Sequence, residues 1–241
     1  MIGAPARRLE PEWLDTNQPD PRDVRESLND LIRINRYLGG FAIYRRAFRR
    51  LLRAVPRGTP LTVLDVGAGS AGVPRYLDAL FQRWGYPARF IPLDVNRDHL
   101  MIGFGPAERK RFPPVVADAA RLPFRDEAVD FVISSLFLHH IDEAVLPVVQ
   151  EWVRVARRGV VINDLIRHRI PILFFRWFSP LLVRSPITRH DGIVSLYRAF
   201  TPGELRRQFA RLSGVKTAWL YHWSFRMGIL IERQRGAIGG S

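Results

Sequence analysis

The stretch LTVLDVGAGSAGVPRYL, residues 61–77, decides the fold of this chain. Its first six residues form an apolar run that is typical of a buried β-strand. Gly67, Gly69 and Gly72 follow with the spacing G-x-G-x-x-G. A glycine turn between a strand and a helix brings helix N–H groups against a ligand, and this spacing is typical of dinucleotide-binding proteins. Asp65, two positions before the first glycine, raises a question about that interpretation.

The charge of Asp65 separates two classes of ligand. A pyrophosphate is doubly anionic, and a carboxylate at the mouth of the turn would repel it. S-adenosylmethionine (SAM) has no phosphate, and its ammonium and sulfonium groups are both favoured beside a carboxylate. The turn therefore favours SAM over NAD or FAD.

Strands and helices alternate from residue 61 to the end of the chain, which predicts an α/β fold with a doubly wound, mostly parallel seven-stranded sheet. The expected strands are 61–66, 88–95, 112–118, 128–137, 159–165, 215–223 and 226–233, and the last two form an antiparallel hairpin at one sheet edge. Helices are expected from the glycine turn to 84, at 143–155, and at 201–212 with Thr201 as its cap.

Residues 1–56 are expected to form an N-terminal arm and a helical cap, and residues 57–241 the main domain, with an insertion at about 165–200. Within the cap, Asp20 and Pro21 suit the start of a helix, and Gly39-Gly40 suit its end. Asn35 interrupts the apolar stripe of this helix. A second, basic helix is expected at 41–54.

The composition limits the functional classes. The 241 residues carry a net charge of +14 and contain no cysteine, which excludes a thiolate nucleophile, and no metal site is predicted. The positive charge is spread along the chain. It indicates either an anionic partner or arginines that serve only as solvated surface cations. No transmembrane or signal segment is recognised, so the expected location is cytoplasmic or peripheral to a membrane.

Acids also follow the next two strands, Asp94 after the second and Asp118, with Ala119, after the third. The segment SLFLHHI, 135–141, follows the fourth strand. Together with DVGAG at 65–69, these elements resemble a class I SAM-dependent methyltransferase of the small-molecule branch, similar to methyltransferases of the ubiquinone and menaquinone pathways. The resemblance implies a Rossmann-like methyltransferase fold, with SAM as cofactor and S-adenosylhomocysteine (SAH) as product.

The resemblance also implies roles for individual residues. Asp65 and the turn would hold the methionine part of SAM, Asp94 the ribose, Asp118 with Ala119 the adenine, and Ser135 with Leu136 the sulfonium. The full set of expected cofactor-binding residues is Asp65, Gly67, Ala68, Gly69, Asp94, Val95, Asp118, Ala119, Ser135 and Leu136.

His139 and His140 follow the fourth strand, where an acceptor must approach. An imidazole near its ordinary pKa suits the deprotonation of a phenol or an enolic carbon acid. Asp164 could orient a histidine or bind the acceptor, and His190 and Asn35 are expected substrate contacts. Each has a structural alternative: His139 or His140 could order the turn, Asp164 could cap a helix, and Asn35 could bond to nearby backbone.

The insertion at 167–190 has an apolar centre flanked by arginines, and it is too short and too interrupted by Pro171, Arg176 and Pro180 to span a bilayer. It is expected to be a lid over an apolar pocket, with an interfacial helix on anionic lipid or a plain packing helix as alternatives. The predicted function is methyl transfer to oxygen or carbon of a hydrophobic small molecule of aromatic, quinone-like or polyketide type. An RNA methyltransferase and a non-catalytic SAM-binding module remain alternatives, and the oligomeric state is open.

Overall fold

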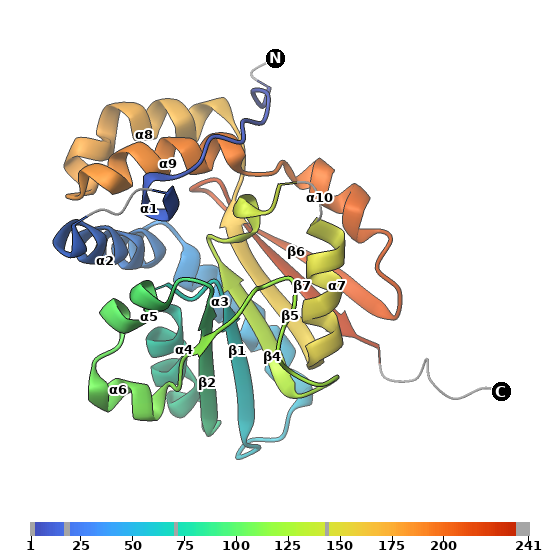
Figure 1. Cartoon of the computed structure of the whole chain (residues 1–241). Helices are drawn as coiled ribbons and strands as arrows, with labels where there is room; N and C mark the ends of the chain where they lie inside the picture. Colours follow the sequence, from blue (N-terminus) through green and yellow to red (C-terminus); the bar gives the residue numbers. More distant parts are fainter. Residues whose placement is uncertain (1–2, 17–19, 70–71, 143–144, 235–241) are drawn as a thin grey trace.

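A computed structural model describes residues 3–16, 20–69, 72–142 and 145–234. A seven-stranded sheet in the order β3-β2-β1-β4-β5-β7-β6 forms the centre of the molecule (Figure 1). Its neighbouring strands run parallel except at β7, which is antiparallel to β5 and to β6. The predicted doubly wound, mostly parallel sheet is confirmed. The strands are β1 Leu61–Val66, β2 Ala88–Asp94, β3 Val115–Val116, β4 Val129–Ser135, β5 Ala156–Leu165, β6 Val215–His222 and β7 Arg226–Arg233.

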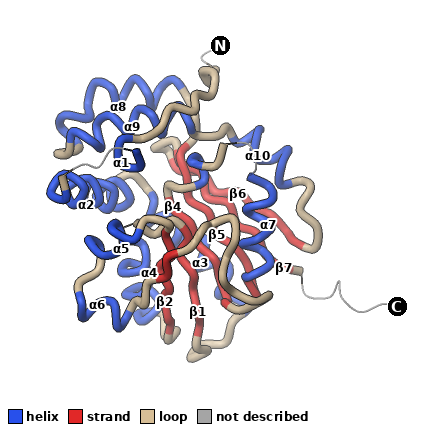
Figure 2. The backbone as a smooth tube through the Cα atoms, viewed as in Figure 1, coloured by secondary structure: helices blue, strands red, loops and turns tan. Residues whose placement is uncertain are grey.

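Helices cover both faces of the sheet (Figure 2). On one face α3 and α4 bury an aromatic-rich core that includes Phe48, Phe81 and Phe131, and on the other α7 and α10 pack around Trp152. These helices and the turns beside them are α3 Gly40–Leu51, η1 Leu52–Ala54, α4 Gly72–Arg83, α5 Arg97–Gly103, α6 Pro106–Arg111, η2 Leu138–His140, α7 Val145–Val155 and α10 Pro202–Phe209.

A third group of helices lies over the carboxyl ends of the strands (Figure 1). It comes from the two ends of the insertion and from the N-terminal cap, because α8 packs on α9, and α9 packs on both α1 and α2. The group consists of α1 Trp13–Thr16, α2 Pro21–Tyr37, α8 Arg169–Leu182 and α9 Pro186–Arg198. The cap and the insertion, which are about 150 residues apart in the sequence, therefore enclose the same edge of the sheet.

Local capping explains where the predicted helices begin. The carboxylate of Asp20 accepts a hydrogen bond of 2.7 Å from the Arg22 N–H, and Pro21 occupies the first turn of α2. Gly39 follows α2 with a φ of 84°, a conformation that costs glycine little. Thr201 caps α10 and exchanges hydrogen bonds with Glu204. These predictions from sequence are confirmed.

Several predicted bounds differ from the structure. The third strand is two residues long, since Pro113 and Pro114 before it cannot donate to a ladder. Helices α1, α5 and α6 were not expected, although the Asn96 side chain caps α5 by accepting from two backbone N–H groups. β5 begins at Ala156 rather than at 159. The expected start of α7 at 143 lies outside the described residues. The division of the chain into an N-terminal part, 1–56, and a main domain, 57–241, stays a prediction.

Among the described residues, none of the helices combines the length and the apolar character that crossing a bilayer requires.

Candidate active site

A cavity of about 680 Å³ lies between the carboxyl ends of the central strands and the helical layer above them. Most of the residues predicted for the cofactor, the substrate and catalysis line it: Asn35, Asp65, Gly67, Ala68, Gly69, Asp94, Val95, Ser135, Leu136, His139 and His140. Four predicted site residues are not among the lining residues: Asp118, Ala119, Asp164 and His190.

The glycine turn forms the floor of one end of the cavity. Gly67 and Gly69 have φ angles of 70° and 48°, in the left-handed region that favours glycine. A Cβ atom on Gly67 would lie 2.3 Å from the ring of Phe137, so a larger residue cannot be accommodated there without movement. The Gly69 N–H donates to a carboxylate oxygen of Asp94 over 2.9 Å. Ser70 and Ala71 of the motif lie outside the described residues.

Asp65 provides the test of whether this end fits SAM. Its side chain is 2% exposed, and its Oδ1 atom has no hydrogen-bond partner among the described residues. Burial, and secondarily the charge of Asp94, raise the pKa of Asp65 well above its ordinary value. A buried carboxylate with an unused acceptor is strongly stabilised by a cation or N–H donor, which the ammonium of SAM would supply.

The other acids at this edge differ in exposure. Asp94 lines the cavity, and its second carboxylate oxygen accepts from the Asn96 N–H over 2.9 Å. Val95 is 71% exposed at the rim. Asp118 is exposed and caps the Ala120 N–H over 2.8 Å, and it does not line the cavity. Its expected contact with the adenine stays a prediction.

The histidine pair occupies the turn η2, immediately after β4. Leu136 enters the turn with a φ of 54°, and its N–H donates to the Asn163 carbonyl over 2.9 Å. His139 is 2% exposed, and its Nδ1 lies 2.7 Å from an Asp164 carboxylate oxygen. The same carboxylate accepts from the His139 N–H over 3.1 Å. Asp164 thus lies behind His139 and orients it.

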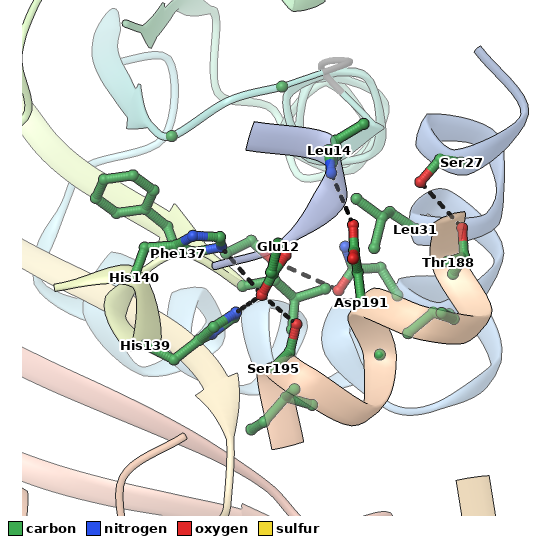
Figure 3. Close-up of a pocket in the computed structure, with 18 of the residues that line it drawn as sticks. Glu12, Leu14, Ser27, Leu31, Phe137, His139, His140, Thr188, Asp191 and Ser195 are labelled. Carbon is green, nitrogen blue, oxygen red and sulfur yellow. Dashed lines mark hydrogen bonds and ion pairs between the residues drawn. The ribbon is translucent and has the colours of Figure 1, made fainter. Parts of the chain in front are cut away.

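Glu12 of the N-terminal arm faces both histidines (Figure 3). One of its carboxylate oxygens lies 3.4 Å from Nε2 of His139 and 3.7 Å from Nε2 of His140. The same oxygen accepts a hydrogen bond of 2.5 Å from the Ser195 hydroxyl on α9. Glu12 is 6% exposed and belongs to a segment that the sequence indicated only as an irregular arm, so sequence reasoning missed it.

The environment of His139 corrects one expectation. Burial alone lowers the pKa of His139, but the carboxylates of Asp164 and Glu12 outweigh it and raise the pKa to about 10. Burial correspondingly raises the pKa of Glu12, while hydrogen bonding to His139 and the charge of the histidines lower it overall. In the described structure, His139 is therefore protonated near neutral pH, so the expected imidazole of ordinary pKa is wrong for this residue.

Two residues of α9 hold the arm against the site. The carboxylate of Asp191 accepts from the backbone N–H groups of Trp13 and Leu14 over 2.8 and 3.0 Å. Arg198 of α9 donates to the carbonyls of Glu10 and His140 over 3.0 and 2.9 Å. These contacts give Glu12 a defined position beside η2.

His190 is not at the cavity. Its ring stacks on Trp13 with the centroids 3.8 Å apart, and its Nδ1 lies 2.8 Å from an Asp191 carboxylate oxygen. Its neighbour Asp191 does line the cavity, as does Gly192. In this structure His190 supports the arm, and its expected role as a substrate contact stays a prediction.

Asn35 belongs to a buried polar network that joins α2 to the sheet. Its side-chain oxygen accepts from a guanidinium nitrogen of Arg226 over 3.0 Å and lies 3.4 Å from the Ser135 hydroxyl. Arg226 is 1% exposed and lines the cavity, and burial lowers its pKa to about 10. Among the described residues, one guanidinium nitrogen of Arg226 and the side-chain oxygen of Asn163 have no partner. Sequence reasoning missed Arg226, the first residue of β7, because its partner Asn35 is 191 residues away in the sequence.

The end of the cavity away from the glycine turn is apolar. The side chains there come from α2, α8, α9 and the β6–β7 turn: Leu31, Ile34, Leu38, Pro171, Phe174, Phe175, Leu196, Trp223 and Phe225. Leu28 of α2 also lines the cavity, but it lies beside the glycine turn at Gly69. Figure 3 shows Leu31 on the same side as Asp191 and Thr188, across from η2. The insertion therefore contributes apolar side chains to the cavity, and its expected role as a lid stays a prediction.

Comparisons with known proteins identify the domain. Residues 64–162 match a family model described as a methyltransferase domain. The demethylmenaquinone methyltransferase of Roseiflexus sp. (strain RS-1) is 26% identical over 162 residues, which cover 63% of this chain and 66% of that relative, slightly less than two thirds of its length.

Solved structures share the fold. A SAM-dependent methyltransferase from Aquifex aeolicus superposes with a TM-score of 0.58 at 17% identity, covering 90% of this chain and 100% of that one. The plantazolicin methyltransferase BpumL, solved in complex with SAH, gives a TM-score of 0.65 at 13% identity, covering 90% and 92% of the two chains. At these identities the structural likeness concerns the fold alone. Residues 64–162 therefore match the model of a methyltransferase domain, and the chain shares the Rossmann-like fold of solved SAM-dependent methyltransferases.

Proposed function

We propose that this protein transfers the methyl group of SAM to an oxygen or carbon atom of a hydrophobic small molecule of aromatic, quinone-like or polyketide type. One observation carries the proposal: a single cavity has an acidic, glycine-lined end beside Asp65 and Asp94 and an apolar end beneath α8 and α9. A cofactor and an apolar acceptor can therefore meet within one enclosure, which is what a direct transfer requires.

At the proposed cofactor end, the chain supplies a negatively charged side chain and a glycine turn whose backbone the cofactor can approach closely. The Asp65 carboxylate suits the ammonium of the methionine part, and the turn at Gly67 and Gly69 lets that part lie against the backbone. Asp94 suits the ribose hydroxyls, and Ser135 and Leu136 line the wall between the two ends. SAM itself supplies a methyl carbon that its sulfonium already activates, so alignment is the larger part of the protein's task.

At the acceptor end, the polar wall of Glu12, His139 and His140 faces the apolar side chains. A hydroxyl or enol group of the acceptor would point toward this wall, because its apolar remainder is favoured against α2 and α8. One guanidinium nitrogen of Arg226 has no partner within the described part of the chain, and it suits an anionic oxygen in the cavity. The acceptor's proton would be lost at this wall, with His139 held in place by Asp164.

The experiment combines calorimetry with a transfer assay. SAH should bind to the full-length protein, and NAD should not, because its pyrophosphate meets the Asp65 carboxylate. Methyl-deuterated SAM and a panel of phenols, hydroquinones and 1,3-dicarbonyl compounds should then yield a labelled product by mass spectrometry. Tighter binding of NAD than of SAH would falsify the proposal.

The two alternatives predict different results in the same assay. An RNA methyltransferase would label RNA and bind it in a salt-dependent manner. A non-catalytic module would bind SAH and label none of the acceptors. The spread of the positive charge along the chain and the apolar acceptor end support the small-molecule reaction over both alternatives.

We also propose that α8 contacts the surface of an anionic membrane. Its outward face carries large apolar side chains that are 41–83% exposed: Ile170, Leu173, Phe174, Trp177, Phe178, Leu181 and Leu182. Exposed arginines at 169, 176 and 184 lie within or beside the helix. Apolar and basic residues in this combination are typical of helices that lie in a membrane interface. Phe174 is also part of the cavity wall, so a hydrophobic acceptor could pass from lipid into the pocket.

A further inference from the structure

Glu12, His139 and His140 converge on one point although the arm and the turn η2 are more than 120 residues apart in the sequence. One carboxylate oxygen of Glu12 and one ring nitrogen of each histidine lie within 4.8 Å of one another. All three residues line the cavity (Figure 3). Two imidazoles and one carboxylate on the wall of a cavity are a ligand set that transition-metal ions use.

The groups behind the two histidines provide a second, independent observation. His139 has its Nδ1 atom 2.7 Å from an Asp164 carboxylate oxygen, and His140 has its Nδ1 atom 3.0 Å from an Asp15 carboxylate oxygen. Both Nε2 atoms are thereby directed toward Glu12. Metal-ligating histidines almost always use their second nitrogen in this way, because the carboxylate fixes the tautomer and makes the ligand more basic.

We propose that Glu12, His139 and His140 bind a divalent transition-metal ion of the zinc type, with its remaining coordination positions open to the cavity. Imidazole ligands favour Zn²⁺, Fe²⁺ or Ni²⁺ over Mg²⁺, which prefers oxygen. A tetrahedral ion with bonds of about 2.0–2.1 Å places its ligand atoms about 3.3–3.4 Å apart. The two distances from Glu12, 3.4 and 3.7 Å, are near this value, and all three ligand atoms lie within 4.8 Å of one another, so that metal binding would draw them closer together.

The ion would lie between the Glu12 carboxylate oxygen and the Nε2 atoms of the two histidines, which are 3.4 and 3.7 Å from that oxygen. It neutralises a carboxylate that is buried against two histidines, and it keeps the Asp164 and Asp15 contacts behind them. The site is compatible with both arm and turn in their present positions, since the ligand atoms already face one another. Three protein ligands and an open position are typical of catalytic rather than structural zinc sites.

The role of the ion rests on the proposed function. A hydroxyl or enol oxygen of the acceptor coordinates the ion through a lone pair and loses its proton to water at a lower pH than the free acceptor does. For an oxygen acceptor, an electron pair of that oxygen then forms the new bond to the methyl carbon of SAM. The bond between sulfur and the methyl carbon breaks, and its electron pair stays on the sulfur of SAH.

A different explanation of the same contacts is an electrostatic clasp, in which Glu12 only holds the arm against η2. The Ser195 hydroxyl, which donates to Glu12, fits both explanations. The metal site and the clasp differ in one measurable property, which is selective metal binding. A clasp needs no metal and has no preference among cations.

The experiment uses the full-length protein after chelator treatment and dialysis. Calorimetry with ZnCl₂ should show one site per chain, MgCl₂ should show none, and CoCl₂ should produce visible absorption bands of an ordered Co²⁺ site. His140→Gln should weaken Zn²⁺ binding by more than about 100-fold, and Asp15→Asn by about 10- to 100-fold. Both positions are partly exposed, with side chains 23% and 47% accessible, so these variants are expected to fold.

His222→Gln is the matched control, because this histidine lies on β6 and does not line the cavity. It should bind Zn²⁺ as the unaltered protein does. Absence of Zn²⁺ binding, or equal binding by His140→Gln and His222→Gln, overturns the metal site. Zn²⁺ binding without methyl transfer to any acceptor supports the metal site and contradicts the proposed function. Full methyl transfer by protein that binds no Zn²⁺ supports the proposed function and contradicts the metal site.

Discussion

At the scale of single residues, Asp65 shows how a binding group can oppose folding. It is buried, one of its carboxylate oxygens has no partner in the part of the chain that the structure describes, and its pKa is raised first by burial and then by Asp94. A carboxyl whose pKa is raised on folding binds its proton more tightly in the folded chain than in the unfolded one. Its effect on stability is therefore unfavourable above the unfolded pKa of about 3.9, and it disappears below that pH.

Asp65→Asn should raise the free energy of unfolding of the ligand-free protein by about 1–3 kcal/mol at pH 7, because it removes a buried, unsatisfied charge. The gain should vanish near pH 4, and SAH affinity should fall at pH 7. Urea unfolding at the two pH values and calorimetry measure these effects. Asp126→Asn, whose side chain is 76% exposed, should change neither quantity. A less stable Asp65→Asn protein at pH 7 would contradict the interpretation.

At the scale of elements, α8 has two faces with different surroundings. Ile172 and Phe175 face the protein and are 4% and 7% exposed, whereas Trp177 and Leu181 face outward and are 74% and 83% exposed. The inner face contributes side chains to the apolar end of the cavity, where we propose that the acceptor binds. The outer face has no partner among the described residues that would account for so much apolar surface.

Replacing both Trp177 and Leu181 by serine should abolish binding to vesicles of phosphatidylglycerol and phosphatidylcholine, since most of the inserted apolar area is lost. Binding of the unaltered protein should weaken with added NaCl, because arginines contribute to it. Sedimentation with vesicles measures both effects. Tyr37→Ser, at an exposed aromatic residue on α2, is the control and should bind normally. Equal binding of all three proteins would exclude α8 as the contact.

At the scale of the whole molecule, the arm is held to the active site by residues far from it in sequence. Asp191 on α9 binds the backbone at Trp13 and Leu14, and Arg7 donates to the carbonyls of Ile141 and Arg198 over 2.9 and 2.7 Å. The cofactor end of the cavity is built from β1, β2 and their loops and makes no use of these contacts. The arm and the cofactor site should therefore respond separately to substitution.

Asp191→Ala should release the arm, because two backbone N–H groups lose their acceptor and His190 loses its partner. Trypsin should then cleave after Arg7 or Arg8 several-fold faster, while SAH affinity stays unchanged. Timed digestion with mass spectrometry, alongside calorimetry, measures the two properties. In Asp126→Ala, a surface acid on another part of the fold, cleavage should remain slow. Equally slow cleavage in both variants would show that Asp191 does not control the arm.

Much of the fold could be predicted from the sequence because its signals are local. The capping by Asp20 and Thr201 depends on residues two or three positions apart, and β1 with its glycine turn is one continuous segment. The short β3 and the helices α5 and α6 were harder to predict. Their bounds depend on packing at the sheet edge and on short polar segments without an apolar period.

The sequence by itself determined the sheet and the chemistry of the cofactor end, because Asp65, the glycines and Asp94 each follow a strand whose carboxyl end must lie at one edge. Only the tertiary structure decided what faces the acceptor. Glu12 reaches His139 across more than 120 residues, and Arg226 reaches Asn35 across 191. The physical reason is that the partners of a buried charge are chosen by the packing of distant segments. For the same reason, the pKa of His139 is raised above the ordinary value expected from the sequence, because its ring is buried between two carboxylates.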